Sequence, residues 1–325
     1  MSAAIDFIRH IGKRCRRAFP VGQQLDMNAP LLSREEILDL SYRAETLDKR
    51  AAHHYEVAHR QYGDARSVYR GFGMDYEESR PYQSGDDFRF MNWRLSARSG
   101  EFYMKVFREE RQPSIFILMD RRSAMRFGTR QRLKVTQAAR VASLLAFGAQ
   151  KHNTPVGGVL LEEEHLQWIP ESPAHAGAFA FINAACAPCP PLAPAVTGQN
   201  TPHLIRLLHN LLVQGSIVYL IGDFIDIDRE SQPALLQLAN EHRVQAIRII
   251  DEAEVDLPSA GELDFIAAGN GLYRIDTSNP QNRQVYREMA KQQRDEQDKI
   301  FAASGIGCVD IHSNETTIER YIPIP

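Results

Sequence analysis

The chain has 325 residues, and 43% of them are hydrophobic, which is enough for a sizeable core in one or two globular domains. Its 38 basic and 41 acidic residues give a formal charge of -3, so it lacks the basic excess typical of nucleic-acid-binding proteins. Four scattered cysteines argue against a disulfide framework and favour a reducing, cytoplasmic location. We expect no membrane-spanning helix, because no apolar run is long enough.

Residues 1–30 are expected to form an N-terminal segment and connector. The first 17 residues place Ile5, Ile8, Ile11 and Cys15 at helical spacing among several basic side chains. Two interpretations stay open. A basic amphipathic helix binds an anionic membrane surface, whereas the same pattern also suits an N-terminal helix that packs on the protein.

Residues 31–112 are expected to form a second segment, with a helix, a loop-like stretch and a strand. Ser33 and Glu36 have the spacing of a capping box and predict a helix start. The stretch 80–89 is rich in Gly, Pro and Asp, 91–98 suits a short helix, and 101–107 has the composition of a strand. Acidic and basic residues nearly balance between 66 and 111. This balance suits either an internally paired loop or a partner-facing patch. The paired loop would join Asp86 and Asp87 to Arg89, Arg94 or Arg98, with Tyr82 and Trp93 packed beneath.

Residues 113–325 alternate between predicted strands and helices. The apolar run 114–120 is typical of a strand buried on both faces, and 132–149 follows it with a wide apolar helical face. Later strands are predicted at 155–161, 165–169, 216–222, 244–250, 272–275 and 308–311, and helices at 173–185, 201–212, 230–241 and 282–303. Thr201 is predicted to cap its helix, with Pro202 at the first position. The pattern predicts a mostly parallel α/β sheet, Rossmann-like, with helices on both faces.

Two of the buried strands end in a carboxylate, at Asp120 and at Asp223. Ligands bind at the carboxyl edge of such sheets, so paired carboxylates there suit a hard cation such as magnesium. The same edge is predicted to be basic, since no acid occurs between Asp120 and Glu162. The basic residues of that interval are Arg121, Arg122, Arg126, Arg130, Arg132, Lys134, Arg140 and Lys151.

Asp120 before a loop, Thr201 before a helix and Asp223 after a strand resemble the metal-ion-dependent adhesion site of a von Willebrand factor A domain. The upstream stretch 80–98, RPYQSGDDFRFMNWRLSAR, resembles the signature of the domain of unknown function 58 family. The resemblance covers roughly residues 65 to 250 and implies a von Willebrand factor A-like fold. The residues that carry the signature are Arg80, Tyr82, Gly85, Asp86, Arg89, Trp93 and Arg98.

The adhesion-site pattern departs from Asp-x-Ser-x-Ser, because Arg122 and Ala124 replace its two serines. We therefore expect a degenerate, metal-free site in which Arg121 or Arg122 pairs with Asp120 or Asp223. Magnesium is disfavoured and no other cofactor is expected. The alternative is that the two aspartates only satisfy backbone donors at strand ends.

The resemblance implies a bacterial, non-enzymatic adaptor that works with a MoxR-type AAA+ ATPase and a client protein. Arg121, Arg122, Arg126 and Asp223 are the predicted partner-binding residues. The competing hypothesis is a magnesium-dependent hydrolase or nucleotide-binding enzyme that uses Asp120 and Asp223. No catalytic constellation emerges from the sequence otherwise, and Cys186 with Cys189 is disfavoured as a metal or redox pair.

Overall fold

The computed structural model describes residues 29–46, 75–83, 86–108, 114–189, 200–266 and 272–322. The described residues fall into two compact units, one of 75–108 and one of all the others. The predicted segment 31–112 is therefore divided. Its helix, α2 (Arg34–Thr46), belongs to the larger unit because Leu40 and Ala44 are buried in that unit's core. The predicted membrane-binding segment 1–17 lies outside the described residues.

The larger unit is built on a six-stranded sheet in the order β10-β7-β6-β3-β4-β5. All neighbours are parallel except β5, which runs antiparallel to β4 at one edge. The strands are β3 (Ile115–Asp120), β4 (Val156–Leu161), β5 (Leu166–Ser172), β6 (Ile217–Gly222), β7 (Arg243–Ile250) and β10 (Gly307–His312). This doubly wound order confirms the predicted Rossmann-like α/β fold with a mostly parallel sheet.

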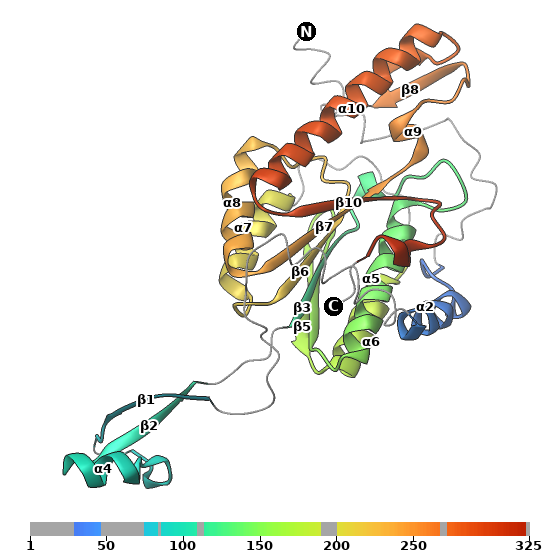
Figure 1. Ribbon diagram of the computed structural model, residues 1–325. Helices are drawn as coiled ribbons and strands as arrows, with labels where there is room; N and C mark the ends of the chain where they lie inside the picture. The colour runs from blue at the N-terminus through green and yellow to red at the C-terminus, as the bar shows by residue number, and fades with distance from the viewer. Residues whose placement is uncertain are drawn as a thin grey trace. The chain divides into compact units, whose positions relative to one another are not determined.

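Helices cover both faces of the sheet (Figure 1). One face carries α2, α5 (Lys134–Lys151) and α6 (Ala174–Ala185), and the other carries α7 (Thr201–Leu211), α8 (Gln232–Glu241) and the end of α10 (Pro280–Ala303). The central strand β3 supplies Ile117 and Met119 to the first core, and Phe116 and Leu118 to the second. Its apolar run is unbroken because successive side chains point to opposite, equally buried faces.

One predicted strand lies outside this sheet. Residues of β9 (Leu272–Asp276) pair with β8 (Glu262–Ile266) in a separate antiparallel hairpin, beside the short helix α9 (Glu252–Val255). Leu257, Leu263, Tyr286 and Ala290 form a small core between this hairpin and the first half of α10. The predicted strand at 272–275 is confirmed, but its place in the main sheet is wrong, because it pairs with β8, which was not predicted.

The smaller unit contains a two-stranded antiparallel sheet and one short helix. Its elements are β1 (Asp75–Pro81), the 3-10 turn η1 (Phe88–Phe90), α4 (Trp93–Ser99) and β2 (Tyr103–Arg108). The strand β1 was not predicted, since its sequence DYEESRP is mostly charged or polar. Shorter 3-10 turns of the larger unit are η2 (Ser123–Met125), η3 (Arg229–Ser231) and η4 (Ile318–Arg320). Within the described residues, no helix combines the length and hydropathy that crossing a membrane requires.

Candidate functional site

Three loops meet at the carboxyl edge of the main sheet, between the neighbouring strands β3 and β6. From β3 the chain continues to β4 on one side, and from β6 it continues to β7 on the other side. In doubly wound sheets, this point of divergence forms a crevice that binds ligands. Asp120 ends β3, Thr201 begins α7, and Asp226 lies in the loop after β6. These three residues therefore bring a carboxylate, a hydroxyl and a second carboxylate to one place.

The guanidinium of Arg122 lies where these three side chains converge. Its Nε and Nη2 atoms donate to the two carboxylate oxygens of Asp120, with the shortest distance 2.6 Å from Nη2 to Oδ2. Its Nη1 atom donates to Oδ2 of Asp226 at 2.7 Å, and Nη2 donates to Oγ1 of Thr201 at 3.1 Å. A single planar cation thus binds two carboxylates and a hydroxyl from three loops.

Burial makes this cluster strongly dependent on charge pairing. The side chain of Asp120 is 3% exposed and that of Arg122 is 13% exposed. Burial disfavours the guanidinium charge, yet the carboxylates of Asp120 and Asp226 raise the pKa of Arg122 well above its ordinary value. Burial raises the pKa of Asp120, whereas Arg122 lowers the pKa of Asp226 despite burial. We conclude that Arg122 stays charged and is the cation that balances this edge.

Local backbone structure explains how Thr201 and Asp226 reach the cluster. Asn200, and not Thr201 as predicted, caps α7 by accepting a hydrogen bond from the His203 amide at 2.8 Å. The Thr201 hydroxyl is therefore available to Arg122, while its amide donates to Asp226 at 2.7 Å. Phe224 has a φ of 56°, an unusual left-handed conformation for a bulky residue, and it turns the chain between β6 and Asp226.

Arg121 and Arg126 do not form the exposed basic loop that the sequence suggested. Their side chains are 3% and 6% exposed, and both lie within 3.1 Å of the carboxylate of Glu162. Arg121 also donates to the carbonyl oxygen of Ala184 at 2.6 Å. Glu163 accepts from the amide and hydroxyl of Ser123. The acids that neutralise this loop come from the turn between β4 and β5, which the linear charge pattern did not indicate.

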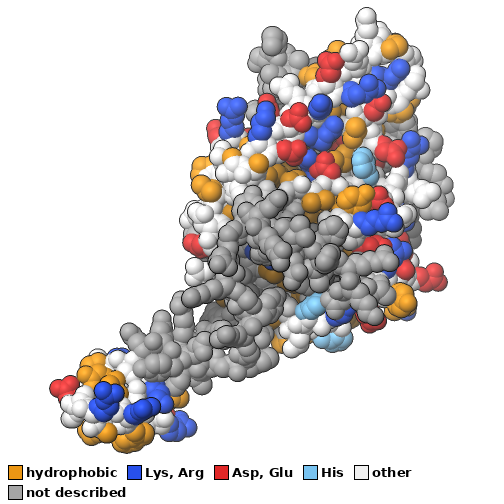
Figure 2. Space-filling view, in the orientation of Figure 1, with side chains coloured by type: hydrophobic (Ala, Val, Ile, Leu, Met, Phe, Trp, Pro, Cys, Tyr) orange, Lys and Arg blue, Asp and Glu red, His pale blue; other side chains and the backbone are white. Residues whose placement is uncertain are grey.

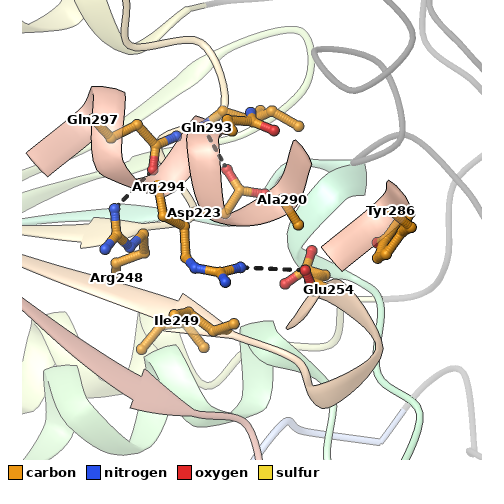
Figure 3. Close-up of a pocket in the computed structure, with 11 residues that line it drawn as sticks. Asp223, Arg248, Ile249, Glu254, Tyr286, Ala290, Gln293, Arg294 and Gln297 are labelled. Atoms are coloured by element: carbon orange, nitrogen blue, oxygen red, sulfur yellow. Dashed lines mark hydrogen bonds between the residues drawn. The ribbon is translucent and has the colours of Figure 1, made fainter. Parts of the chain in front are cut away.

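Asp223 belongs to a different cluster from Asp120, which corrects its predicted place in the site. Its Oδ2 accepts from Nζ of Lys134 at 3.1 Å, and Lys134 also donates to Glu254 at 2.6 Å. Lys134 is fully buried, and the two carboxylates raise its pKa although burial opposes its charge. Asp223 and Glu254 line a pocket beside α10, together with Arg248 and Arg294 (Figure 3). No pattern in the sequence predicted that Lys134, the first residue of α5, would reach this edge.

A divalent metal does not fit the Arg122 cluster as it stands. The guanidinium donors already lie against the carboxylate and hydroxyl oxygens that a hard cation would need. Ala124, at the second replaced serine, is buried and has no side-chain oxygen. Asp120 and Asp223 pair with different cations, Arg122 and Lys134. Across the described ranges, no set of three or more His, Cys, Asp or Glu side chains is arranged to hold a metal.

Restoring the serines should convert the cluster into a metal site. We expect the double variant Arg122→Ser, Ala124→Ser to gain thermal stability from Mn²⁺, because Asp120, Asp226 and Thr201 then present free oxygens. An ion at 100 times its Kd would add about 2.7 kcal/mol to the free energy of unfolding. Thermal unfolding with and without Mn²⁺ measures this gain, with Ala124→Ser alone as the control. Equal stabilisation of the unmodified chain by Mn²⁺ would contradict the assignment of Arg122 as the resident cation.

Cys186 and Cys189 are buried free thiols beneath this edge. Burial raises the pKa of both, and that of Cys186 to about 11. Thiols with raised pKa values are poor nucleophiles near neutral pH.

The signature residues lie in the smaller unit and divide between ion pairs and exposed side chains. Arg80 binds Asp86 with distances of 2.9 and 2.6 Å, and Arg89 binds the neighbouring Asp87 at 2.6 Å. Trp93 is 63% exposed and does not pack beneath the loop as one interpretation required. Tyr82 does pack, between Phe88 and Phe102, and Arg98 is exposed on α4. Gly85 lies outside the described residues.

Comparison with known proteins gives relatives without an assigned activity. The chain is 24% identical to the uncharacterized protein Rv1480 of Mycobacterium tuberculosis over 237 residues, which cover 72% of this chain and 73% of that protein. Among solved structures, the conserved hypothetical protein BatB from Bacteroides thetaiotaomicron matches 64% of this chain and 94% of its own, with 14% identity and a TM-score of 0.40.

A von Willebrand factor type A structure from Catenulispora acidiphila covers 59% of this chain and 44% of its own, with 11% identity and a TM-score of 0.30. Structural likeness at these scores carries no argument about function. The family model for "Protein of unknown function DUF58" matches residues 78–296, which include the signature and the Arg122 cluster. The chain therefore belongs to the DUF58 family.

Proposed function

We propose that this chain is a non-enzymatic protein-interaction adaptor in the bacterial cytoplasm, which works with a MoxR-type AAA+ ATPase in the assembly or maturation of a client protein. The observation that carries the proposal is the position of Arg122. The guanidinium holds the three loops that a metal ion would otherwise join, at the edge where doubly wound sheets bind their ligands. We therefore expect the adaptor to bind its partner without a dissolved metal ion.

The partner-binding surface in this proposal is the rim of that edge, and not the arginines themselves. Arg121, Arg122 and Arg126 are already bound to the protein's own carboxylates, so they position the loop and do not contact the ATPase. Glu164 is exposed in the turn between β4 and β5, next to the two glutamates that hold the loop. We therefore expect Glu164 to contact a partner that binds at this edge.

Binding to a MoxR-type ATPase from the same genome tests the proposal. The chain is stripped with EDTA, immobilised and titrated with the ATPase in buffer free of divalent ions. We expect the Kd to change less than twofold when Mn²⁺ is restored, and Glu164→Arg to weaken binding at least tenfold. The matched control is Lys151→Glu, an exposed charge reversal at the end of α5, on the opposite edge of the sheet. Loss of binding without metal, or equal effects of both variants, would refute the proposal.

A further inference from the structure

The smaller unit has a very small core for its size. Among its described side chains, Met91, Ser96 and Met104 are the buried ones, at 3%, 8% and 4% exposure. The elements described in this unit are the hairpin β1–β2, the turn η1 and the seven-residue helix α4. A two-stranded hairpin is marginally stable by itself, so such a unit needs additional apolar contacts in its working state.

Large aromatic side chains lie on its surface. Trp93 is 63% exposed, Phe102 is 60% exposed and Phe88 is 56% exposed. The ring of Tyr82 joins Phe88, at 5.3 Å, to Phe102, at 6.4 Å. The amide of Asn92 donates to the carbonyl of Tyr103 at 2.7 Å, so these two chain segments lie side by side. Trp93 follows Asn92 and Phe102 precedes Tyr103 in these segments. We call Trp93, Phe88 and Phe102 the aromatic surface, and the exposure of three large rings on one small unit is typical of an interaction site.

Some charged side chains beside the aromatic surface form ion pairs within the unit, and others do not. Asp86 and Asp87 are bound by Arg80 and Arg89. In contrast, Arg94 and Arg98 on α4 are exposed, four residues apart, and form no ion pair with any described residue. Figure 2 shows hydrophobic and basic side chains interspersed on the visible face of this unit. The groups left available for a partner are therefore aromatic rings and two guanidiniums, the residue types enriched at binding hot spots.

The surrounding acids distinguish a protein partner from a membrane. Asp87 is next to Phe88 in the chain and Glu101 is next to Phe102, and both acids are exposed. Asp87 is paired with Arg89, but inserting Phe102 into an anionic membrane would bring the Glu101 carboxylate against negative headgroups, which is unfavourable. A protein surface carries both signs of charge. It can therefore place acids opposite Arg94 and Arg98 without placing acids opposite Asp87 and Glu101.

We propose that the aromatic surface, with Arg94 and Arg98, binds a protein segment that presents aliphatic or aromatic side chains next to acidic ones. The inference builds on the proposed function by assigning a partner surface and its chemistry, because an adaptor needs a second site besides the edge that meets the ATPase. The aromatic rings supply apolar contact area, and the guanidiniums select acidic over basic segments.

Trp93 provides a direct test, because the chain has only two tryptophans. In a Trp168→Phe background the fluorescence reports Trp93 alone. We expect acrylamide to quench it readily in the free chain. A random 16-residue peptide library is then displayed against the full chain, and peptides that also bind the variant Trp93→Ser, Arg94→Glu, Arg98→Glu are removed. We expect the enriched peptides to carry Asp or Glu beside apolar residues, and to shift Trp93 emission to the blue.

Control variants show whether a selected peptide binds at the aromatic surface. We expect a selected peptide to bind Arg98→Glu at least tenfold more weakly, and to bind Arg206→Glu, Leu211→Ser on α7 as tightly as the unmodified chain. Shielding of Trp93 in the free chain, enrichment of peptides with no acidic bias or no enrichment at all would overturn the inference. A blue shift with phosphatidylglycerol vesicles as large as with peptide would assign the surface to a membrane. The ATPase titration with Glu164→Arg is independent of these results, so failure of one proposal is distinguishable from failure of the other.

Discussion

Replacing Arg122 with alanine is expected to lower the free energy of unfolding of the larger unit by about 3–5 kcal/mol, the usual cost of removing one partner from a buried ion cluster. The carboxylate of Asp120, 3% exposed, would lose its bidentate partner and face Asp226 across an empty space. Denaturation with urea, followed by circular dichroism, measures the loss. The control is Arg130→Ala, which removes an exposed ion pair with Glu252 and should cost less than about 1 kcal/mol.

The pH dependence of this variant follows from the pKa of Asp120. Burial already raises that pKa in the folded chain, and loss of the guanidinium removes the charge that opposed the rise. The folded state then holds a proton that the unfolded state releases, so the stability of the variant increases as the pH falls through the folded pKa. We expect the deficit relative to the unmodified chain to be smaller at pH 5 than at pH 8. A deficit that is constant with pH would mean that the loss comes from packing and not from the unpaired carboxylate.

Replacing Lys134 with methionine should cost a similar amount, about 3–5 kcal/mol, for the same physical reason. Lys134 is fully buried and donates to both Asp223 and Glu254, so its removal leaves two carboxylates close together. Burial raises the pKa of Glu254, and the variant should therefore be more stable at pH 5 than at pH 8.

A compensating variant makes this second prediction specific. Adding Asp223→Asn and Glu254→Gln to Lys134→Met removes the unpaired charges while keeping the side-chain volumes close to the original. We expect the triple variant to regain most of the lost stability in the same urea titration. If Lys134→Met and the triple variant are equally unstable, the lysine contributes through its packing and not through its charge.

Much of the larger unit follows from the sequence, because buried parallel strands and amphipathic helices leave strong local patterns. The run ending at Asp120 and the capping box of Ser33 are examples, and the structure contains both reciprocal hydrogen bonds of that box. Strand β1 was not predicted because its residues alternate in neither hydrophobicity nor size. Strand β9 was predicted at 272–275, but β8 and the pairing of the two strands were not, because composition does not encode pairing between separate segments.

The site illustrates the limit of reasoning from linear spacing. Asp120, Arg122 and Thr201 lie together at the expected edge. The second acid of the cluster is Asp226 and not Asp223, because the turn at Phe224 moves Asp226 into the cluster and leaves Asp223 beside Lys134. The segment 223–228, DFIDID, contains three acids within six residues. Their spacing alone does not reveal which of them faces inward. The pairing of Arg121 and Arg126 with Glu162 depends on two strands that are neighbours only in the folded sheet.

The attachment of the Arg122 cation to the chain also determines how this edge can move. A bound ion exchanges with solvent, and its occupancy follows the ionic composition of the cell. The guanidinium cannot diffuse away, so chelation does not release the loops. Separating α7 from the β3 loop requires rotation of one side chain about its own bonds and rupture of its contacts with Asp120, Asp226 and Thr201 at the same time.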